Sequence, residues 1–351
     1  EHAGLLHMYT HLMEMSPHPE KALRHGDALS TLIPDAGHLR HMPTHVDVLC
    51  GDYMNVVLRN DAAIVADRKF LAREGPDNFY SVYRAHNYHF KIYGAMFLGQ
   101  PSSALDAAED LISTLPTETL RPMADWFEGF IPMKQHVLIR FGRWQDILDQ
   151  TLPEDEELYC VTLAMMRYAR TVAFANTQQI DVAHTERDHF YEARDKVPES
   201  RMLFNNTCRD ILGVGEQMML GELAYHMGDH ETAFAHLRKS VEIDDNLPYD
   251  EPWGWMQPTR HALGALLLEQ GQTDEAEAVY RADLGLDATL SRACQHPGNV
   301  WSLHGLHECL TRRGETVEAA HIKLQLDKAA ARAEVPIKAS CYCRQKHLAA
   351  E

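Results

Sequence analysis

Residues 37–53 read GHLRHMPTHVDVLCGDY and contain three closely spaced histidines. If this stretch is helical, His41 and His45 follow His38 by three and seven residues, so the three imidazoles share one face within two turns. Pro43 lies between two of these histidines, where it removes a backbone hydrogen bond and bends a helix. Either the helix is kinked and turns His41 and His45 towards a common point, or it begins at Pro43 and leaves His38 and His41 on a loop.

The start of the chain carries a similar histidine pair. His7 and His11 are four residues apart, His41 follows His7 by 34 residues, and His45 follows His11 by the same interval. Thirty-four residues is the period of the tetratricopeptide helix–turn–helix unit. The spacing therefore predicts that these histidines occupy equivalent positions in consecutive repeats.

Helical periodicity continues along the chain, while the alternation typical of strands is nearly absent. Gly and Pro stand at the breaks, as expected for helix ends and starts. We predict an all-α fold, a tetratricopeptide-like right-handed superhelical solenoid of antiparallel helix pairs. Four parts are expected: histidine-rich repeats with the metal site at residues 1–150, irregular helical repeats at 151–210, clearer repeats at 211–340, and a tail at 341–351. The first helix would have an uncovered flank, so we expect a further N-terminal piece.

Composition narrows the possible partners. The chain has 351 residues, of which 45% are hydrophobic and 24% charged, and a net charge of −18. This charge repels nucleic acids and anionic membranes, so neither is expected as a partner. No apolar run is long enough to span a bilayer. The seven cysteines are an odd number and mostly dispersed, which indicates reduced thiols and a cytoplasmic protein.

The glycine turns at residues 51, 99 and 142 give a second alignment of the repeats. It predicts two columns and a shorter row on the first helices of the pairs, which line the inner wall of such a solenoid: His7, His41 and His89; His11, His45, Tyr93 and His136; His38 and His86. We therefore expect His41 to lie near His7 and His89, and His45 to lie near His11.

Clustered neutral imidazoles suit copper, iron, zinc or nickel, whereas magnesium and calcium prefer oxygen ligands. A structural zinc site closes with four ligands, and this cluster offers more. The predicted ligands of one or two transition-metal ions are His7, His11, His38, His41, His45, His86, His89 and His136. Copper is the leading expectation, with iron or zinc as alternatives. Three imidazoles per ion resembles the ligand set, though not the fold, of the dicopper proteins that bind dioxygen.

Two further residues are predicted to take part in catalysis. Glu14 follows His11 by three residues, so it either orients a histidine from behind, binds the metal itself, or moves protons. Tyr93 replaces a histidine in its column. It either donates a hydrogen bond to a bound substrate or packs in the core.

These motifs resemble those of large tetratricopeptide-repeat proteins that carry an HxxxH helix followed by a GHLxHMPSH segment. Here the two motifs are residues 7–11, HMYTH, and residues 37–45, GHLRHMPTH, with Thr44 in place of the usual Ser. Residues 85–90, AHNYHF, and residues 298–303, GNVWSL, also look like segments of that family. The resemblance covers nearly the whole chain and implies the repeat fold. Most members are described only as repeat proteins, so it implies no reaction.

Three functions remain open from the sequence. The leading hypothesis is a metal-dependent oxidoreductase that uses the histidine cluster to activate dioxygen and oxidise a small organic substrate. The alternative is a non-catalytic scaffold that binds a peptide or a protein partner in the groove of the solenoid. Metal storage or delivery would use the same ligands as the oxidoreductase.

Overall fold

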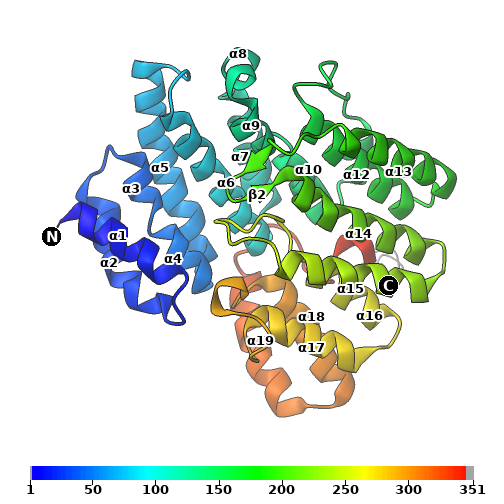
Figure 1. Ribbon diagram of the computed structural model, residues 1–351. Coiled ribbons are helices and arrows are strands. Elements are labelled where there is room, and N and C mark those ends of the chain that lie inside the picture. The colour runs from blue at the N-terminus through cyan, green and yellow to red at the C-terminus, as the bar shows by residue number, and fades with distance from the viewer. Residues whose placement is uncertain (1, 345–351) are drawn as a thin grey trace. The chain divides into compact units, whose positions relative to one another are not determined.

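The structure is a computed structural model that describes residues 2–344, and its regular structure is almost entirely helical (Figure 1). The described strands, β1 (Met202–Leu203) and β2 (Asn206–Thr207), form one short antiparallel hairpin. The predicted all-α class with paired helices is therefore confirmed. Most of the predicted tail, residues 345–351, lies outside the described residues.

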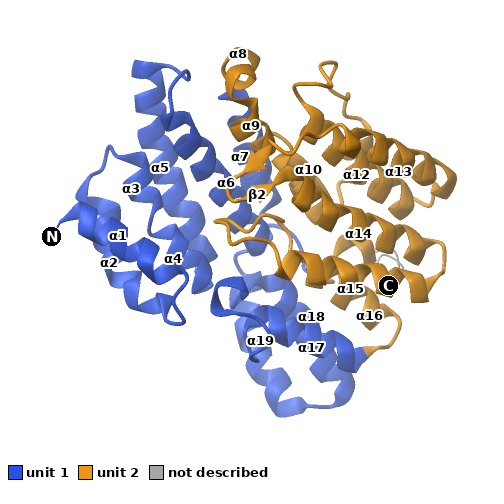
Figure 2. Ribbon diagram, in the orientation of Figure 1, with its two compact units in different colours: residues 1–115, 273–337 blue, residues 116–272, 338–351 orange. Residues whose placement is uncertain are grey.

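Internal contacts divide the chain into two compact units (Figure 2). Unit 1 contains residues up to 115 together with residues 273–337, and unit 2 contains residues 116–272 together with the described residues from 338 on. Unit 1 thus joins the beginning of the chain to a late segment that the sequence analysis placed in a different part.

Unit 1 is built from helices connected by short turns. In chain order these are α1 (Ala3–Glu14), the 3₁₀ turn η1 (Pro19–Ala22), α2 (Leu23–Leu32), α3 (Gly37–His41), α4 (Thr44–Leu49), α5 (Tyr53–Glu74), α6 (Tyr80–Leu98), α7 (Pro101–Ser113), α17 (Thr273–Leu284), η4 (Arg292–Cys294), α18 (Val300–Arg313) and α19 (Thr316–Ala330).

Helix α6 is the central helix of unit 1, since nearly all of its residues are buried. It packs against α5 and α7 and also against α3 and α18. Gly99 ends α6 in the left-handed conformation, with φ of 74°, and Pro101 begins α7. This is the arrangement of helix end and helix start that the glycine turn predicted.

Close helix approach depends on small residues at defined positions. A Cβ atom on Gly305 of α18 would lie 2.1 Å from Cζ of Tyr280 on α17, so the tyrosine ring occupies the space where other residues carry a side chain. In unit 2, a Cβ on Gly221 would lie 2.7 Å from Cγ of Leu237. Tetratricopeptide-like pairs pack small residues against large ones in this way, so the pairs cannot separate without losing buried apolar area.

Unit 2 contains the remaining described helices. They are α8 (Thr117–Leu120), η2 (Arg121–Met123), α9 (Ala124–Phe127), η3 (Glu128–Phe130), α10 (Met133–Arg140), α11 (Trp144–Leu148), α12 (Cys160–Asn176), α13 (Ile180–Asp195), α14 (Cys208–His226), α15 (His230–Asp245) and α16 (Thr259–Glu269). The pairs α12/α13 and α14/α15 are long helical hairpins that pack against each other.

The cysteines are mostly free thiols. Cys341 and Cys343 form a disulfide, and the free cysteines are Cys50, Cys160, Cys208, Cys294 and Cys309. The expectation of reduced thiols thus differs from the structure at the last pair of the chain. Among the described residues, no helix combines the length and apolar character needed to cross a bilayer.

Candidate metal centre

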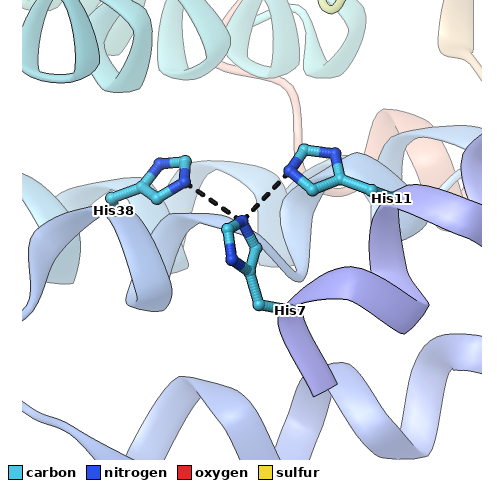
Figure 3. A group of neighbouring side chains, drawn as sticks. All are labelled: His7, His11 and His38. Carbon is cyan, nitrogen blue, oxygen red and sulfur yellow. Dashed lines mark hydrogen bonds between the residues drawn. The ribbon is translucent and has the colours of Figure 1, made fainter. Parts of the chain in front are cut away.

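Three histidines of α1 and α3 converge at the edge of unit 1, and we call His7, His11 and His38 the outer triad. Nε2 of His7 lies 3.0 Å from Nε2 of His11 and 3.2 Å from Nε2 of His38. Figure 3 shows the three rings with these nitrogens turned towards one another. The side chain of His11 is 39% exposed, so solvent reaches the outer triad.

Three more histidines form a buried group, the inner triad of His41, His45 and His86. Nε2 of His45 lies 2.7 Å from Nε2 of His41 and 3.4 Å from Nε2 of His86. The ring of Phe90 packs against all three imidazoles, with centroid distances between 4.7 and 5.3 Å. The triads adjoin each other, since the ring centroids of His11 and His45 are 5.7 Å apart.

Pro43 interrupts the helix between His41 and His45, and the four-residue spacing of these histidines still brings both rings to one face. α3 ends at His41, Pro43 occupies the position before α4, and the hydroxyl of Thr44 donates to the carbonyl of His41 at 2.7 Å. The chain is therefore broken into two short helices rather than bent within one. The alternative that His38 and His41 lie on a loop is wrong, because both belong to α3.

Glu14 lies between the two triads, on the Nδ1 side of one histidine from each. Its Oε1 lies 3.1 Å from Nδ1 of His11 and 3.0 Å from Nδ1 of His45, and its side chain is only 5% exposed. Nδ1 of His11 also hydrogen-bonds Oε2 of Glu14 at 3.3 Å. The negative charge beside both rings favours the proton on each Nδ1, which leaves each Nε2 as the ligating nitrogen. One carboxylate thus favours one tautomer and one ring orientation for a histidine in each triad.

Asn60 orients the ring of His41 by a hydrogen bond to its Nδ1. Nδ2 of Asn60 donates to the carbonyl of Val56 at 2.8 Å, which leaves Oδ1 to face Nδ1 of His41 at 2.8 Å. Nδ1 of His41 must therefore carry the proton, and its Nε2 is unprotonated. Because the charge of Glu14 draws the proton of His45 to Nδ1, the Nε2 lone pairs of His41 and His45 then face each other 2.7 Å apart. Such a contact is repulsive unless a cation lies between the lone pairs.

Burial keeps these imidazoles neutral. It lowers the pKa of His38 to about 3, with the neighbouring charge of His7 as the next cause. Burial also lowers the pKa of His41 and of His86 well below the usual 6.5, and the charges of neighbouring histidines add to this effect. The pKa of His7 is lowered by burial and then by His11. Neutral imidazole is the form that binds metals, so the four histidines with a lowered pKa need not lose protons near neutral pH: His7, His38, His41 and His86.

The spacing of the nitrogens fits transition-metal ligation. With metal–nitrogen bonds of about 2.0–2.1 Å in a tetrahedral arrangement, two ligating nitrogens stand about 3.4 Å apart. The Nε2 contacts of 2.7–3.4 Å within the triads require only small ring movements to reach this value. All donors are imidazole nitrogens, which suit copper, zinc and iron.

The other predicted residues lie elsewhere. His89 is fully buried on α6, and its charge lowers the pKa of His86 after the effect of burial, but it belongs to neither triad. His136 belongs to unit 2, where its ring packs against Trp255 at 4.7 Å and burial lowers its pKa to about 3. The hydroxyl of Tyr93 contacts Nε2 of His296 at 3.0 Å.

The predicted neighbour relations hold only in part. His45 lies beside His11 as expected, whereas the ring contacts of His41 are with His45, His86, His38 and Phe90 rather than with His7. His41 and His45 are four residues apart and lie on one face, where both rings meet His86 of α6 instead.

Sequence reasoning missed Asn60 and the pair Asp283 and His296. Nδ1 of His296 contacts Oδ1 of Asp283 at 2.8 Å, which leaves Nε2 to accept the hydrogen bond from Tyr93. The available signal for Asn60 was its position on the buried face of α5, four residues after Val56. A polar residue on such a face needs a partner.

Comparisons with known proteins agree with a helical repeat scaffold. Residues 217–282 match the family model described as "Tetratricopeptide repeat". Among solved structures, the chain is similar to the crystal structure of the TPR domain of P58(IPK), with 14% identity over 89% of this chain and 82% of that chain, and a TM-score of 0.22. A TM-score this low does not establish a common arrangement of helices. The search of the curated proteins gave no match.

Proposed function

We propose that unit 1 binds two transition-metal ions, one in each triad, and that the chain is a metal-dependent oxidoreductase. The observation that supports this proposal is the convergence of the Nε2 atoms within each triad. Those of His41 and His45 are 2.7 Å apart, with Asn60 and Glu14 on the Nδ1 side of the two rings. A buried contact of this kind is stable when a cation lies between the nitrogens. In the outer triad, Glu14 likewise lies on the Nδ1 side of His11, so one carboxylate is shared between the two triads.

Copper is the proposed metal, with iron or zinc as alternatives. An all-imidazole ligand set favours copper among the redox-active metals, and zinc supplies no redox chemistry. Bound copper would supply electron transfer to dioxygen and the oxidation of a small organic substrate.

The chain's own residues would contribute in three ways. The six imidazoles bind through Nε2, and Glu14 and Asn60 hold the rings in orientation from the Nδ1 side. Phe90 covers the inner triad and excludes water from it. Glu14 lies 3.0 Å from Nδ1 of the buried His45 and hydrogen-bonds Nδ1 of the exposed His11, so its carboxylate can carry a proton between the inner triad and solvent.

The test is metal analysis of protein purified without a metal-affinity tag and then reconstituted. We expect two equivalents of copper in the wild type and one after either His38→Ala or His86→Ala, since each variant disrupts one triad. We also expect the reconstituted protein to consume dioxygen when a small organic reductant is supplied. Wild-type protein that retains no transition metal would overturn the metal centre. If the protein binds two ions but consumes no dioxygen with any reductant supplied, the oxidoreductase hypothesis is wrong and metal storage is the remaining function.

A non-catalytic scaffold for a peptide or protein partner is the second candidate, favoured by the tetratricopeptide match of residues 217–282. It predicts exposed and unclustered histidines, yet the inner triad is buried and six imidazoles converge. A scaffold of this kind would bind no metal in the experiment above, so the same measurement separates the two candidates.

A further inference from the structure

Unit 1 contains a cavity apart from the triad residues, where the ends of α5, α6 and α19 meet α18. Its volume is about 170 Å³, and its lining is apolar on one side and polar on the other. The residues used below are Tyr53, Phe97, Leu98, Leu303, Lys328 and Arg332. A cavity of about 150 Å³ is large enough for benzene, so this one accommodates a compact ring with a small substituent.

Tyr53 lines the cavity and carries a buried polar group. The side chain is 2% exposed, and the hydroxyl has no hydrogen-bond partner among the described residues. The Tyr53 ring stacks on Phe97 at 4.8 Å, and Phe97 stacks on His296 at 5.1 Å. His296 in turn contacts Asp283 at 2.8 Å. A buried donor without a partner is costly, and a ligand oxygen would satisfy it.

Two cations stand on the exposed side of the cavity. Lys328 lies near the end of α19 and Arg332 follows it by four residues, and neither side chain pairs with a carboxylate in the described part of the chain. By contrast, Lys323 of the same helix pairs with Asp327, and Arg281 pairs with Glu277 and Glu318. In a protein of net charge −18, two neighbouring cations left without carboxylates form a local positive site.

We propose that this cavity binds a small monocarboxylate with a compact apolar body of about the size of benzoate. The carboxylate pairs with Lys328 and Arg332, and the apolar body packs against Phe97, Leu98 and Leu303. The hydroxyl of Tyr53 donates to an oxygen of the same carboxylate. None of the lining residues belongs to either triad, so the site does not depend on the proposed metal centre.

Isothermal titration of the full chain with benzoate, benzamide and inorganic phosphate tests the proposal. We expect saturable 1:1 binding of benzoate with a Kd of about 1 mM or lower, the range that a ligand of this size can reach. Benzamide has the same ring without the charge, and phosphate has charge without the ring. Both should bind at least about tenfold more weakly than benzoate, because benzamide cannot pair with the two cations and phosphate cannot pack against the apolar residues.

Variants separate binding from folding. Lys328→Gln and Arg332→Gln should each weaken benzoate about tenfold. The matched control is Lys21→Gln, which removes one positive charge from unit 1 outside the cavity and should leave the Kd unchanged. Tyr53→Phe should weaken benzoate about tenfold while the melting temperature of the free protein stays equal or rises, because the variant removes an unsatisfied buried hydroxyl.

Three results would overturn the proposal. The first is the absence of saturable benzoate binding to the wild type. The second is benzamide or phosphate binding as tightly as benzoate, which would show that the ring or the charge alone is recognised. The third is a Tyr53→Phe protein with wild-type stability and wild-type benzoate affinity.

Discussion

Replacing Glu14 by glutamine tests the most specific feature of the metal centre, a single carboxylate that holds one histidine of each triad. The two histidines use different oxygens of Glu14, since Nδ1 of His11 hydrogen-bonds Oε2 at 3.3 Å and Nδ1 of His45 lies 3.0 Å from Oε1. A glutamine has nearly the same shape, but only one of its two polar atoms accepts hydrogen bonds. At least one histidine therefore either loses its partner or faces an amide N–H.

The size of the effect follows from the role of such partners in metal sites. Loss of a hydrogen-bond partner behind a metal-binding histidine lowers metal affinity about 10–100-fold, or about 1.4–2.7 kcal/mol. Because Glu14 serves both triads, we expect both ions to bind more weakly in Glu14→Gln. The metal-free variant should keep its stability within about 1 kcal/mol, since only the net value of one hydrogen bond changes.

A competition titration with a chromophoric copper chelator measures both affinities, and thermal unfolding of the metal-free proteins reports the fold. The matched control is Glu20→Gln, because Glu20 also contacts a histidine, His18 at 3.3 Å, but on the surface, with both side chains at least half exposed. This control should leave both affinities unchanged. A folded Glu14→Gln protein that binds both ions as tightly as the wild type would refute the bridging role of Glu14.

Two further predictions concern stability. Gly305→Ala places a Cβ 2.1 Å from the ring of Tyr280, so α17 and α18 must shift, and we expect a loss of about 2–3 kcal/mol in urea unfolding. Burial raises the pKa of Glu222 to about 7, with the amide of Asn176 opposing the rise. The native state therefore binds this proton more tightly than the unfolded state. Stability should fall as pH rises from about 5 to 8, by up to about 3 kcal/mol from this group. Glu222→Gln should abolish that part of the loss.

Each of these predictions has a control on the same scaffold. A Cβ on Gly213, which lies inside α14, meets no atom within 4 Å, so Gly213→Ala should instead stabilise the protein by about 0.5–1 kcal/mol. Equal destabilisation by both alanine variants would contradict the steric reasoning. Glu242 pairs with Lys239 on the surface, and Glu242→Gln should leave the pH dependence as in the wild type. A Glu222→Gln protein with an unchanged pH profile would show that Glu222 is not the titrating group.

Much of the helical organisation could be predicted locally. Gly99 and Pro101 mark a helix end and a helix start because their backbone preferences act within a few residues. The proximity of His11 and His45 also followed from the repeat period, since equivalent positions in adjacent helix pairs lie next to each other. Both inferences need only chain geometry and repetition.

The composition of each triad could not be predicted in the same way. His41 contacts His45 and His86 rather than His7, and His86 comes from α6, whose approach no sequence period describes. Tyr93 is a similar case, since its partner His296 is 203 residues away in the sequence.

The helical class, the acidic net charge and a group of histidines could be inferred from the sequence, because these depend on residue type and on spacing within one or two helices. Which nitrogens meet, the position of Glu14 and Asn60 behind the rings, and the lack of a hydrogen-bond partner for the Tyr53 hydroxyl among the described residues are properties of the folded chain. Those properties depend on the rotation and approach of helices far apart in the chain. The packing of complete side chains decides both, and repeat periodicity does not encode it.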